Sequence, residues 1–158
     1  MSRPLIFLDV DGPLIPFAPR PGNPHVTDDG GNPLLNRLDP ADGRALRALP
    51  GDLVWATTWT HDANEVVGPR LGLPELPVVE WPDDDASVTP YGLHWKTITL
   101  SRWADGRSFV WLDDEITDAD RAWVAAHHPE RALLHRVDAQ VGLSERDFAA
   151  LERWLTGR

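Results

Sequence analysis

The chain of 158 residues contains no cysteine, one methionine and one tyrosine. Without thiols it can form neither a disulfide framework nor a thiolate zinc site. No apolar run approaches the roughly 18 residues that a membrane-spanning helix needs. The first residues also lack the apolar core and the small-residue cleavage site of a secretory signal. We therefore expect a cytoplasmic protein that makes no membrane contact.

Lysine is almost absent as well. The chain has 15 basic residues, and all of them except Lys96 are arginine. Arginine and lysine are not interchangeable where a compact point charge must enter a tight site, so the single ammonium makes Lys96 a candidate site residue. Chance within an arginine-rich composition is the alternative explanation.

The formal net charge of −10 indicates an acidic protein. This charge argues against a partner nucleic acid held by a broad basic surface, because such binding depends on neutralising many phosphates. It does not exclude an enzyme that acts on one phosphate group, since a bound cation reverses the local field.

Apolar runs alternate with helical patterns along the whole chain. The length suits one domain over residues 1–158, and a hydrophobic content of 42% argues against disorder. Helical patterns cover residues 39–49, 62–71, 94–103 and 118–127, and a further one follows a capping-box sequence at Ser144. Five runs read as buried strands: Leu5–Val10, Leu53–Thr57, Pro77–Trp81, Phe109–Leu112 and Leu133–Val137. The alternation predicts an α/β protein, a three-layer Rossmann-like fold with a parallel five-stranded sheet and helices on both faces.

One segment breaks this alternation. Between Gly12 and Leu38 the sequence holds six prolines and four glycines, so we expect no regular element there. The segment directly follows the first strand, and ligands of open α/β sheets bind beyond the carboxyl ends of the strands. We therefore interpret residues 12–38 as a mobile flap over a binding site, with a disordered insertion as the alternative.

Candidate site residues stand at the carboxyl ends of three of the predicted strands. They are Asp9, Asp11 and Gly12 at the end of the first strand, Thr57 and Thr58 at the second, and Asp113 and Asp114 at the fourth. The helix that leads into the fourth strand carries Lys96. A parallel sheet gathers all of these at one edge, and strand alternation predicts that the side chains of Asp9 and Asp11 point the same way.

These residue types suit phosphoryl transfer. Carboxylates packed together repel one another unless a divalent cation lies among them, and oxygen-only ligands favour Mg²⁺. Gly12 lets the backbone turn close to a substrate. A threonine hydroxyl can donate a hydrogen bond to a phosphate oxygen, and a lysine can neutralise the charge that develops during transfer.

The order of these residues resembles the haloacid dehalogenase-like (HAD) superfamily. The resemblance lies in Asp9-Val10-Asp11-Gly12 after an apolar strand, followed by Thr57, Lys96 and Asp113-Asp114, and it spans nearly the whole chain. More narrowly, residues 55–59, 94–97 and 111–115 are similar to the small HAD domains associated with Swiss army knife RNA-repair proteins. The resemblance implies a Mg²⁺-dependent phosphohydrolase, a phosphomonoesterase with a minimal cap or none.

The resemblance also implies a role for each position. Asp9 would be the nucleophile that forms an aspartyl-phosphate, and Asp11 the general acid and then the general base. Lys96 would hold both the phosphate and the nucleophile. Either Thr57 or its neighbour Thr58 would bind the phosphoryl group.

For the metal, the resemblance implies Mg²⁺ held by Asp9, by the backbone carbonyl of Asp11 and by one or both of Asp113 and Asp114. Pro13 departs from the commoner threonine or valine and removes a backbone N–H from the phosphate-binding turn.

The phosphorylated substrate is open at this point. An uncapped site suits a nucleic-acid end or a phosphoprotein, and it also serves a nucleotide or a small metabolite where oligomerisation closes it. Of the eight tryptophans, Trp55 and Trp111 lie within predicted buried strands, whereas Trp59 is the best candidate for stacking on a base.

Two alternative functions use the same residue types. One is a non-catalytic or receiver-like signalling module that binds phosphate, although the chain order of acid pair, threonine, lysine and second acid pair argues against a receiver. The other is a metal-dependent nuclease that needs no covalent step.

Overall fold

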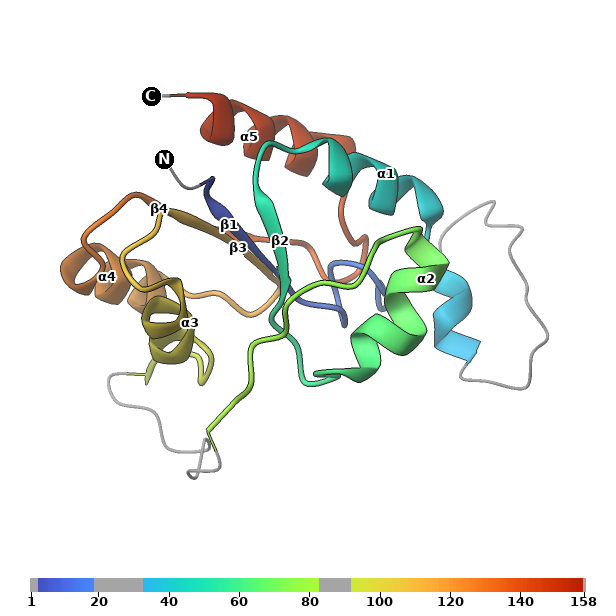
Figure 1. Ribbon diagram of the computed structural model, residues 1–158, viewed down its shortest axis with the longest axis horizontal. Helices are drawn as coiled ribbons and strands as arrows, with labels where there is room; N and C mark the ends of the chain where they lie inside the picture. The colour runs from blue at the N-terminus through green and yellow to red at the C-terminus, as the bar shows by residue number, and fades with distance from the viewer. Residues whose placement is uncertain (1–2, 19–32, 83–91, 158) are drawn as a thin grey trace.

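The computed structural model describes residues 3–18, 33–82 and 92–157. Its sheet consists of β1 (Leu5–Leu8), β2 (Asp52–Trp55), β3 (Phe109–Asp113) and β4 (Ala132–Arg136), all parallel, in the spatial order β2-β1-β3-β4 (Figure 1). Every residue of β1 and of β3 is buried. Continuous apolar runs of this kind are typical of parallel strands that are covered on both faces.

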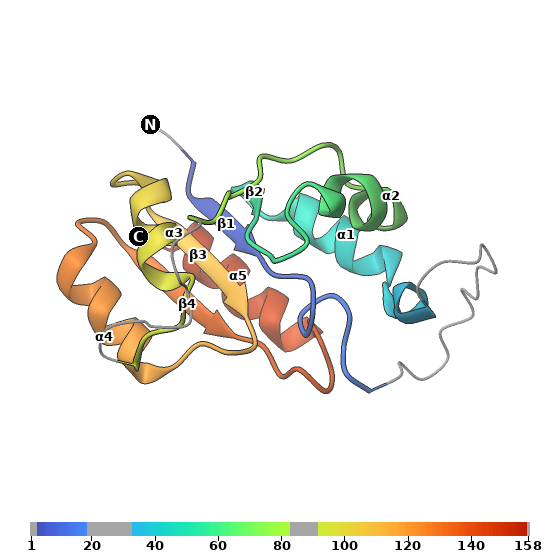
Figure 2. The same cartoon turned by 90° about the horizontal axis from the view of Figure 1, so that it is seen from below.

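Helices cover both faces of the sheet, as Figure 2 shows from below. On one face, α1 (Pro40–Ala48) and α5 (Glu145–Thr156) pack on the side chains of Ile6 and Leu8. On the other, α3 (Thr97–Ala104) and α4 (Asp118–His127) pack on those of Leu5 and Phe7. Successive side chains of β1 therefore pack into two separate hydrophobic cores, one on each face of the sheet. The three-layer α/β arrangement with a parallel sheet is confirmed.

The predicted fifth strand is wrong. In the segment 77–81 the structure has one isolated bridge, between Trp55 and Val78. The Trp55 N–H donates to the Pro77 carbonyl at 2.9 Å, and the Val79 N–H donates to the Trp55 carbonyl at 2.9 Å. Pro77 has no N–H of its own, and Pro74 and Pro82 bracket the segment, so the ladder cannot extend. The sheet of the described residues thus has four strands.

The helix ends follow the predicted capping residues. The Asp39 side chain accepts a hydrogen bond from the Ala41 N–H at 2.9 Å, and the Ser144–Asp147 capping box opens α5. The predicted helix over 62–71 is instead a π-helical turn, η2 (Ala63–Val67), followed by the short α2 (Gly68–Leu71). Within the described part of the chain, no helix combines the length and the apolar character needed to cross a bilayer.

The predicted flap over 12–38 is described at its two ends. Leu14 and Ile15 are buried in the core, and the Arg37 guanidinium donates to the carbonyls of Pro16 and Phe17 at 3.0 and 2.8 Å. The second end contains a 3-10 helix, η1 (Pro33–Arg37), so the expectation of no regular element is wrong there. Residues 19–32, the rest of the predicted flap, lie outside the described residues.

Candidate active site

The side chain of Lys96 lies at the centre of the carboxyl edge of the sheet. Its Nζ is 3.0 Å from Asp9 Oδ1, 2.9 Å from Asp113 Oδ2 and 2.9 Å from the carbonyl oxygen of Ala56. These acceptors stand at the ends of β1, β3 and β2. An ammonium has three N–H donors. Lys96 is only 3% exposed, and the protein supplies an acceptor for each of the three. This geometry explains why lysine stands here in a chain that otherwise uses arginine.

The start of α3 differs from the prediction. The helix begins at Thr97 rather than at His94, because the His94 ring accepts a hydrogen bond from the Lys96 N–H through Nδ1 at 3.1 Å. Lys96 therefore occupies the capping position, one residue before the first helical turn. From this position its side chain extends back to the strand ends.

Asp120 is a residue that sequence reasoning missed. It is fully buried, and its Oδ1 accepts hydrogen bonds from the His94 N–H at 2.8 Å and from the Thr97 hydroxyl at 2.6 Å. Its Oδ2 caps α4 by accepting from the Thr117 N–H and hydroxyl. The Thr117–Asp120 spacing is a capping-box signal. Nothing in the sequence indicates that the same carboxylate also holds the turn before Lys96.

Three carboxylates form an acidic cluster beside Lys96. Oxygen atoms of Asp9, Asp113 and Asp114 lie within 4.8 Å of one another. Burial raises the pKa of Asp9 well above its usual value; the Lys96 charge lowers it, and the Asp113 charge raises it. Burial and the charge of Asp113 likewise raise the pKa of Asp114 to about 6. One ammonium is thus too little positive charge for three carboxylates, and the oxygen-only donor set fits a Mg²⁺ ion.

A second group, His94 with Asp113 and Glu115, is a weaker candidate for a metal. Because His94 Nδ1 accepts from a backbone N–H, the proton of the neutral ring is on Nε2, which faces Glu115 Oε1 at 3.7 Å. Burial lowers the pKa of His94, which favours this neutral ring. We interpret His94 as a support for the Lys96 turn.

Asp11 and Asp9, predicted to point the same way, differ in burial and in hydrogen-bond partner. Asp9 is buried against Lys96, whereas Asp11 is exposed and accepts a hydrogen bond from Trp59 Nε1 at 3.1 Å. Strand β1 ends at Leu8, and the chain then turns, with two N–H groups donating to the Val10 carbonyl. Strand alternation therefore no longer applies at position 11, and the Asp11 carboxylate lies outside the acidic cluster.

Gly12 lies directly against the acidic cluster. Its φ is +102°, and a Cβ at this position would be 2.7 Å from Asp114 Cγ. Both the backbone conformation and the lack of space therefore require glycine.

We expect Gly12→Ala to shift Asp114 and weaken Mg²⁺ binding. Gly72 is the matched control, since its φ is +72° but no atom lies within 4 Å of the point that a Cβ would occupy. Both variants should lose about 1 kcal/mol of stability from backbone strain, and Gly12→Ala about 1–3 kcal/mol more from the clash. Thermal melts with and without Mg²⁺ measure both effects. Equal losses in the two variants would show that Asp114 does not depend on Gly12.

The two candidate threonines have different surroundings. Thr57 is 1% exposed, its Oγ1 accepts from the Trp59 N–H at 3.2 Å, and its carbonyl accepts from Trp81 Nε1 at 2.9 Å. Thr58 is exposed. Trp81 and Trp95 meet edge to face with ring centroids 4.8 Å apart, and Lys96 Nζ lies 5.9 and 5.4 Å from the two centroids, so these half-buried indoles lie beside Lys96. Trp55 and Trp111 are fully buried, as predicted for core residues.

A parallel α/β sheet with acids, a threonine and a lysine at its carboxyl edge is the arrangement of HAD-like domains, which points to a hydrolase in general. Residues 5–148 match the family model described as the HAD domain in Swiss Army Knife RNA repair proteins, and the chain belongs to this family. Neither a curated protein nor a solved structure matches the chain.

Proposed function

We propose that this protein is a Mg²⁺-dependent phosphomonoesterase that works through an aspartyl-phosphate on Asp9. The observation that carries the proposal is the buried Lys96 ammonium, which bridges Asp9 and Asp113 at 3.0 and 2.9 Å. A buried charge bridge is weak evidence for a purely structural role, because well-packed apolar residues are often as stable. Its place at the strand ends where ligands bind supports a role in phosphate chemistry.

In the proposed reaction, Asp9 attacks the phosphorus through the oxygen that does not bond to Lys96. A bond forms between this oxygen and phosphorus while the ester P–O bond breaks, and Asp11 gives its proton to the leaving oxygen. Asp11 then takes a proton from a water molecule, which attacks the same phosphorus and releases inorganic phosphate from Asp9. Thr57 or Thr58 donates to the phosphate oxygens in both steps, and the Lys96 ammonium holds Asp9 and stabilises the phosphate charge from beside it.

Mg²⁺ fits the acidic cluster by its donor chemistry. Carboxylate oxygens of Asp9, Asp113 and Asp114, with the backbone carbonyl of Asp11, would hold the ion. When bound, it supplies the positive charge that lets a phosphate dianion approach these carboxylates. The raised pKa of Asp114, about 6, means that metal binding competes with protonation of this carboxyl in mildly acidic solution.

For the substrate we propose a phosphorylated nucleic-acid end, with a nucleotide as the simpler form. The described residues that surround the site include the half-buried indoles of Trp59, Trp81 and Trp95, which offer flat surfaces for a base. The family description, which concerns RNA repair, supports the same substrate class.

Phosphate release from a substrate panel tests this proposal. The panel contains an aryl phosphate, mononucleotides, sugar phosphates and oligonucleotides phosphorylated at the 3′ or the 5′ end. We expect release that requires Mg²⁺, stops with EDTA and is fastest for oligonucleotide ends. Faster release from sugar phosphates would overturn the substrate assignment, and a chain that releases no phosphate from any of them would contradict the phosphomonoesterase.

A further inference from the structure

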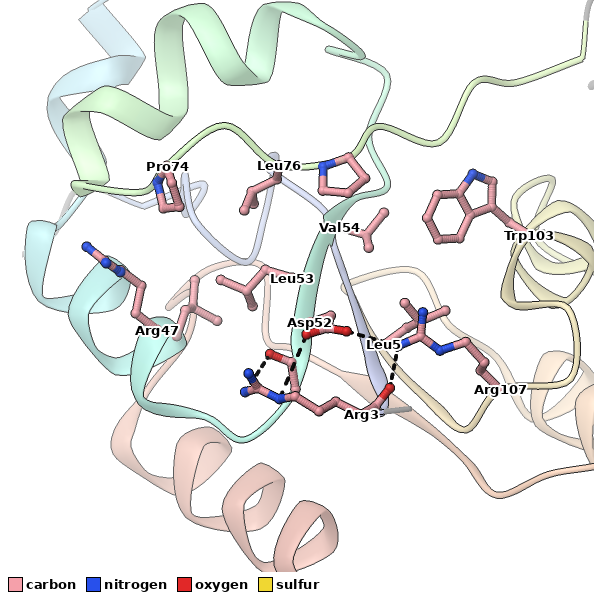
Figure 3. Close-up of a pocket in the computed structure, with 13 residues that line it drawn as sticks. Arg3, Leu5, Arg47, Asp52, Leu53, Val54, Pro74, Leu76, Trp103 and Arg107 are labelled. Atoms are coloured by element: carbon pink, nitrogen blue, oxygen red, sulfur yellow. Dashed lines mark hydrogen bonds and ion pairs between the residues drawn. The ribbon is translucent and has the colours of Figure 1, made fainter. Parts of the chain in front are cut away.

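A cavity lies at the opposite end of the sheet from Lys96. It has a volume of about 430 Å³, and it lies beside Leu5 and Asp52, the first residues of β1 and β2 (Figure 3). Asp9 and Asp113, by contrast, stand at the far ends of β1 and β3. Small-molecule sites in proteins have volumes of about 300–1,000 Å³, so this cavity is large enough to bind a ligand.

The cavity is cationic within an acidic chain. Arg3, Arg47 and Arg107 line it, and among the described residues around it Asp52 is the one acid. Asp52 Oδ2 accepts from Arg107 at 2.9 Å, and its other oxygen is 3.8 Å from Arg3. The lining thus has one carboxylate and three guanidinium groups, and the carboxylate pairs with two of them. The result is a local charge of +2 in a chain of net charge −10.

Part of this positive charge has no acceptor. Arg3 donates through Nη2 to the carbonyls of Leu49 and Gly51, and Arg47 donates through Nη1 to that of Gly72. The Nε of Arg107 is buried and has no hydrogen-bond partner in the described part of the chain. A buried donor without an acceptor is destabilising, and the Arg107 guanidinium therefore has hydrogen-bonding capacity that this part of the chain does not use.

The remaining lining suits a flat apolar group. Trp103 is 37% exposed and shares the Arg107 side of the cavity, and Leu53, Val54 and Leu76 lie between this side and Arg47 (Figure 3). The rings of Trp103 and Phe7 meet edge to face with centroids 5.8 Å apart. Other parts of the indole remain in contact with solvent. Aromatic and aliphatic walls with a few charged groups are the usual composition of a small-molecule site.

An added peptide strand fits this place less well. Asp52 and Ala56 donate to β1, so alternation turns the N–H and C=O of Leu53 and Trp55 to the outer side of β2. Trp55 is already paired with the segment 77–79. Leu53 thus offers one residue's pair of backbone groups, which is too short a ladder to hold a strand.

We propose that this cavity binds a small organic anion. Its acid group, a carboxylate or a phosphate-type group, bonds to the Arg107 and Arg3 guanidinium groups, and its apolar body lies against Trp103 and Leu53. The site is separate from the acidic cluster, and the inference does not depend on the proposed phosphatase activity.

Fluorine NMR of protein labelled with 5-fluorotryptophan tests the proposal. The signal of Trp103 is assigned among the eight tryptophans with the Trp103→Phe variant. The probes are 2-naphthoate and 2-naphthylphosphonate, with neutral 2-naphthamide as the comparison, all without added metal. We expect at least one of the two acids to shift the Trp103 signal at submillimolar concentration. Comparing the two acids shows whether the site recognises a carboxylate or a phosphate-type group.

Two double variants with the same charge change are compared. Arg3→Gln with Arg107→Gln should weaken binding at least about tenfold, because the charge-assisted hydrogen bonds to the acid group are lost. Arg44→Gln with Arg102→Gln, exposed on α1 and α3, should leave binding unchanged. If the first pair does not fold, Arg3→Gln alone is compared with Arg44→Gln. Equal affinity for the amide, no Trp103 shift at millimolar acid, or equal losses in test and control variants would overturn the proposal.

Discussion

Replacing Asp9 with asparagine is expected to lower phosphate release by about 10⁴-fold or more while leaving the protein folded. The neutral amide is a poor nucleophile and cannot form an aspartyl-phosphate. The fold should tolerate the change, because asparagine has nearly the same shape as aspartate and its amide oxygen can still accept the hydrogen bond from Lys96. Phosphate release and circular dichroism on the same preparation measure both effects.

The matched control for this variant is Asp52→Asn, which alters an acid at the other end of the sheet. It should retain wild-type phosphate release. Full activity in Asp9→Asn would contradict the covalent mechanism. With Mg²⁺ still required, such activity would favour the alternative of metal-dependent hydrolysis by the same acids without a covalent step. Fluorine NMR of a beryllium fluoride complex on Asp9 provides a second readout, independent of turnover.

Replacing Lys96 with methionine should have the largest effect on stability. The ammonium bonds to Asp9 and Asp113, and its removal leaves two buried carboxylates without their cation. Breaking a buried pair in this way costs about 3–5 kcal/mol, and activity should be lost as well. The denaturant midpoint of the metal-free protein measures the change.

A double-mutant cycle separates this charge effect from lost packing. Lys96→Met combined with Asp9→Asn should recover part of the lost stability, because one of the two unpaired carboxylates is then gone. Lys96→Arg should not restore activity, since a planar guanidinium cannot direct three donors to the ends of three strands. A Lys96→Met protein as stable as the wild type would count against the central role given to this ion bridge.

Much of the sheet could be predicted from the sequence, for physical reasons. Four apolar runs between turn residues became parallel strands because each is long enough to pair and has helices to cover it. The run at Pro77–Trp81 has the same apolar character but makes one isolated bridge instead of a strand. Pro77 lacks an N–H, and Pro74 and Pro82 flank the run. Apolar content predicts burial, whereas ladder pairing also needs an N–H at alternate positions.

The meeting of Asp9, Lys96 and Asp113 was also predictable, because a parallel sheet brings its carboxyl ends to one edge. The exposure of Asp11 and its bond to Trp59 were not, since they depend on where β1 ends and the chain turns. The contacts of Asp120 were not predictable either. They join residues more than 20 positions apart, and such a pairing leaves no periodic trace in the sequence.

Asp120 also bears on how the site adapts to its substrate. One carboxylate bonds to both the turn before Lys96 and the first turn of α4, and so links these two segments. We therefore expect the site to adjust to a bulky substrate on the other face of the sheet, where Trp59 packs. There, a hydrogen bond at 3.1 Å links Asp11 to Trp59, and breaking it would free both side chains to turn toward an incoming molecule.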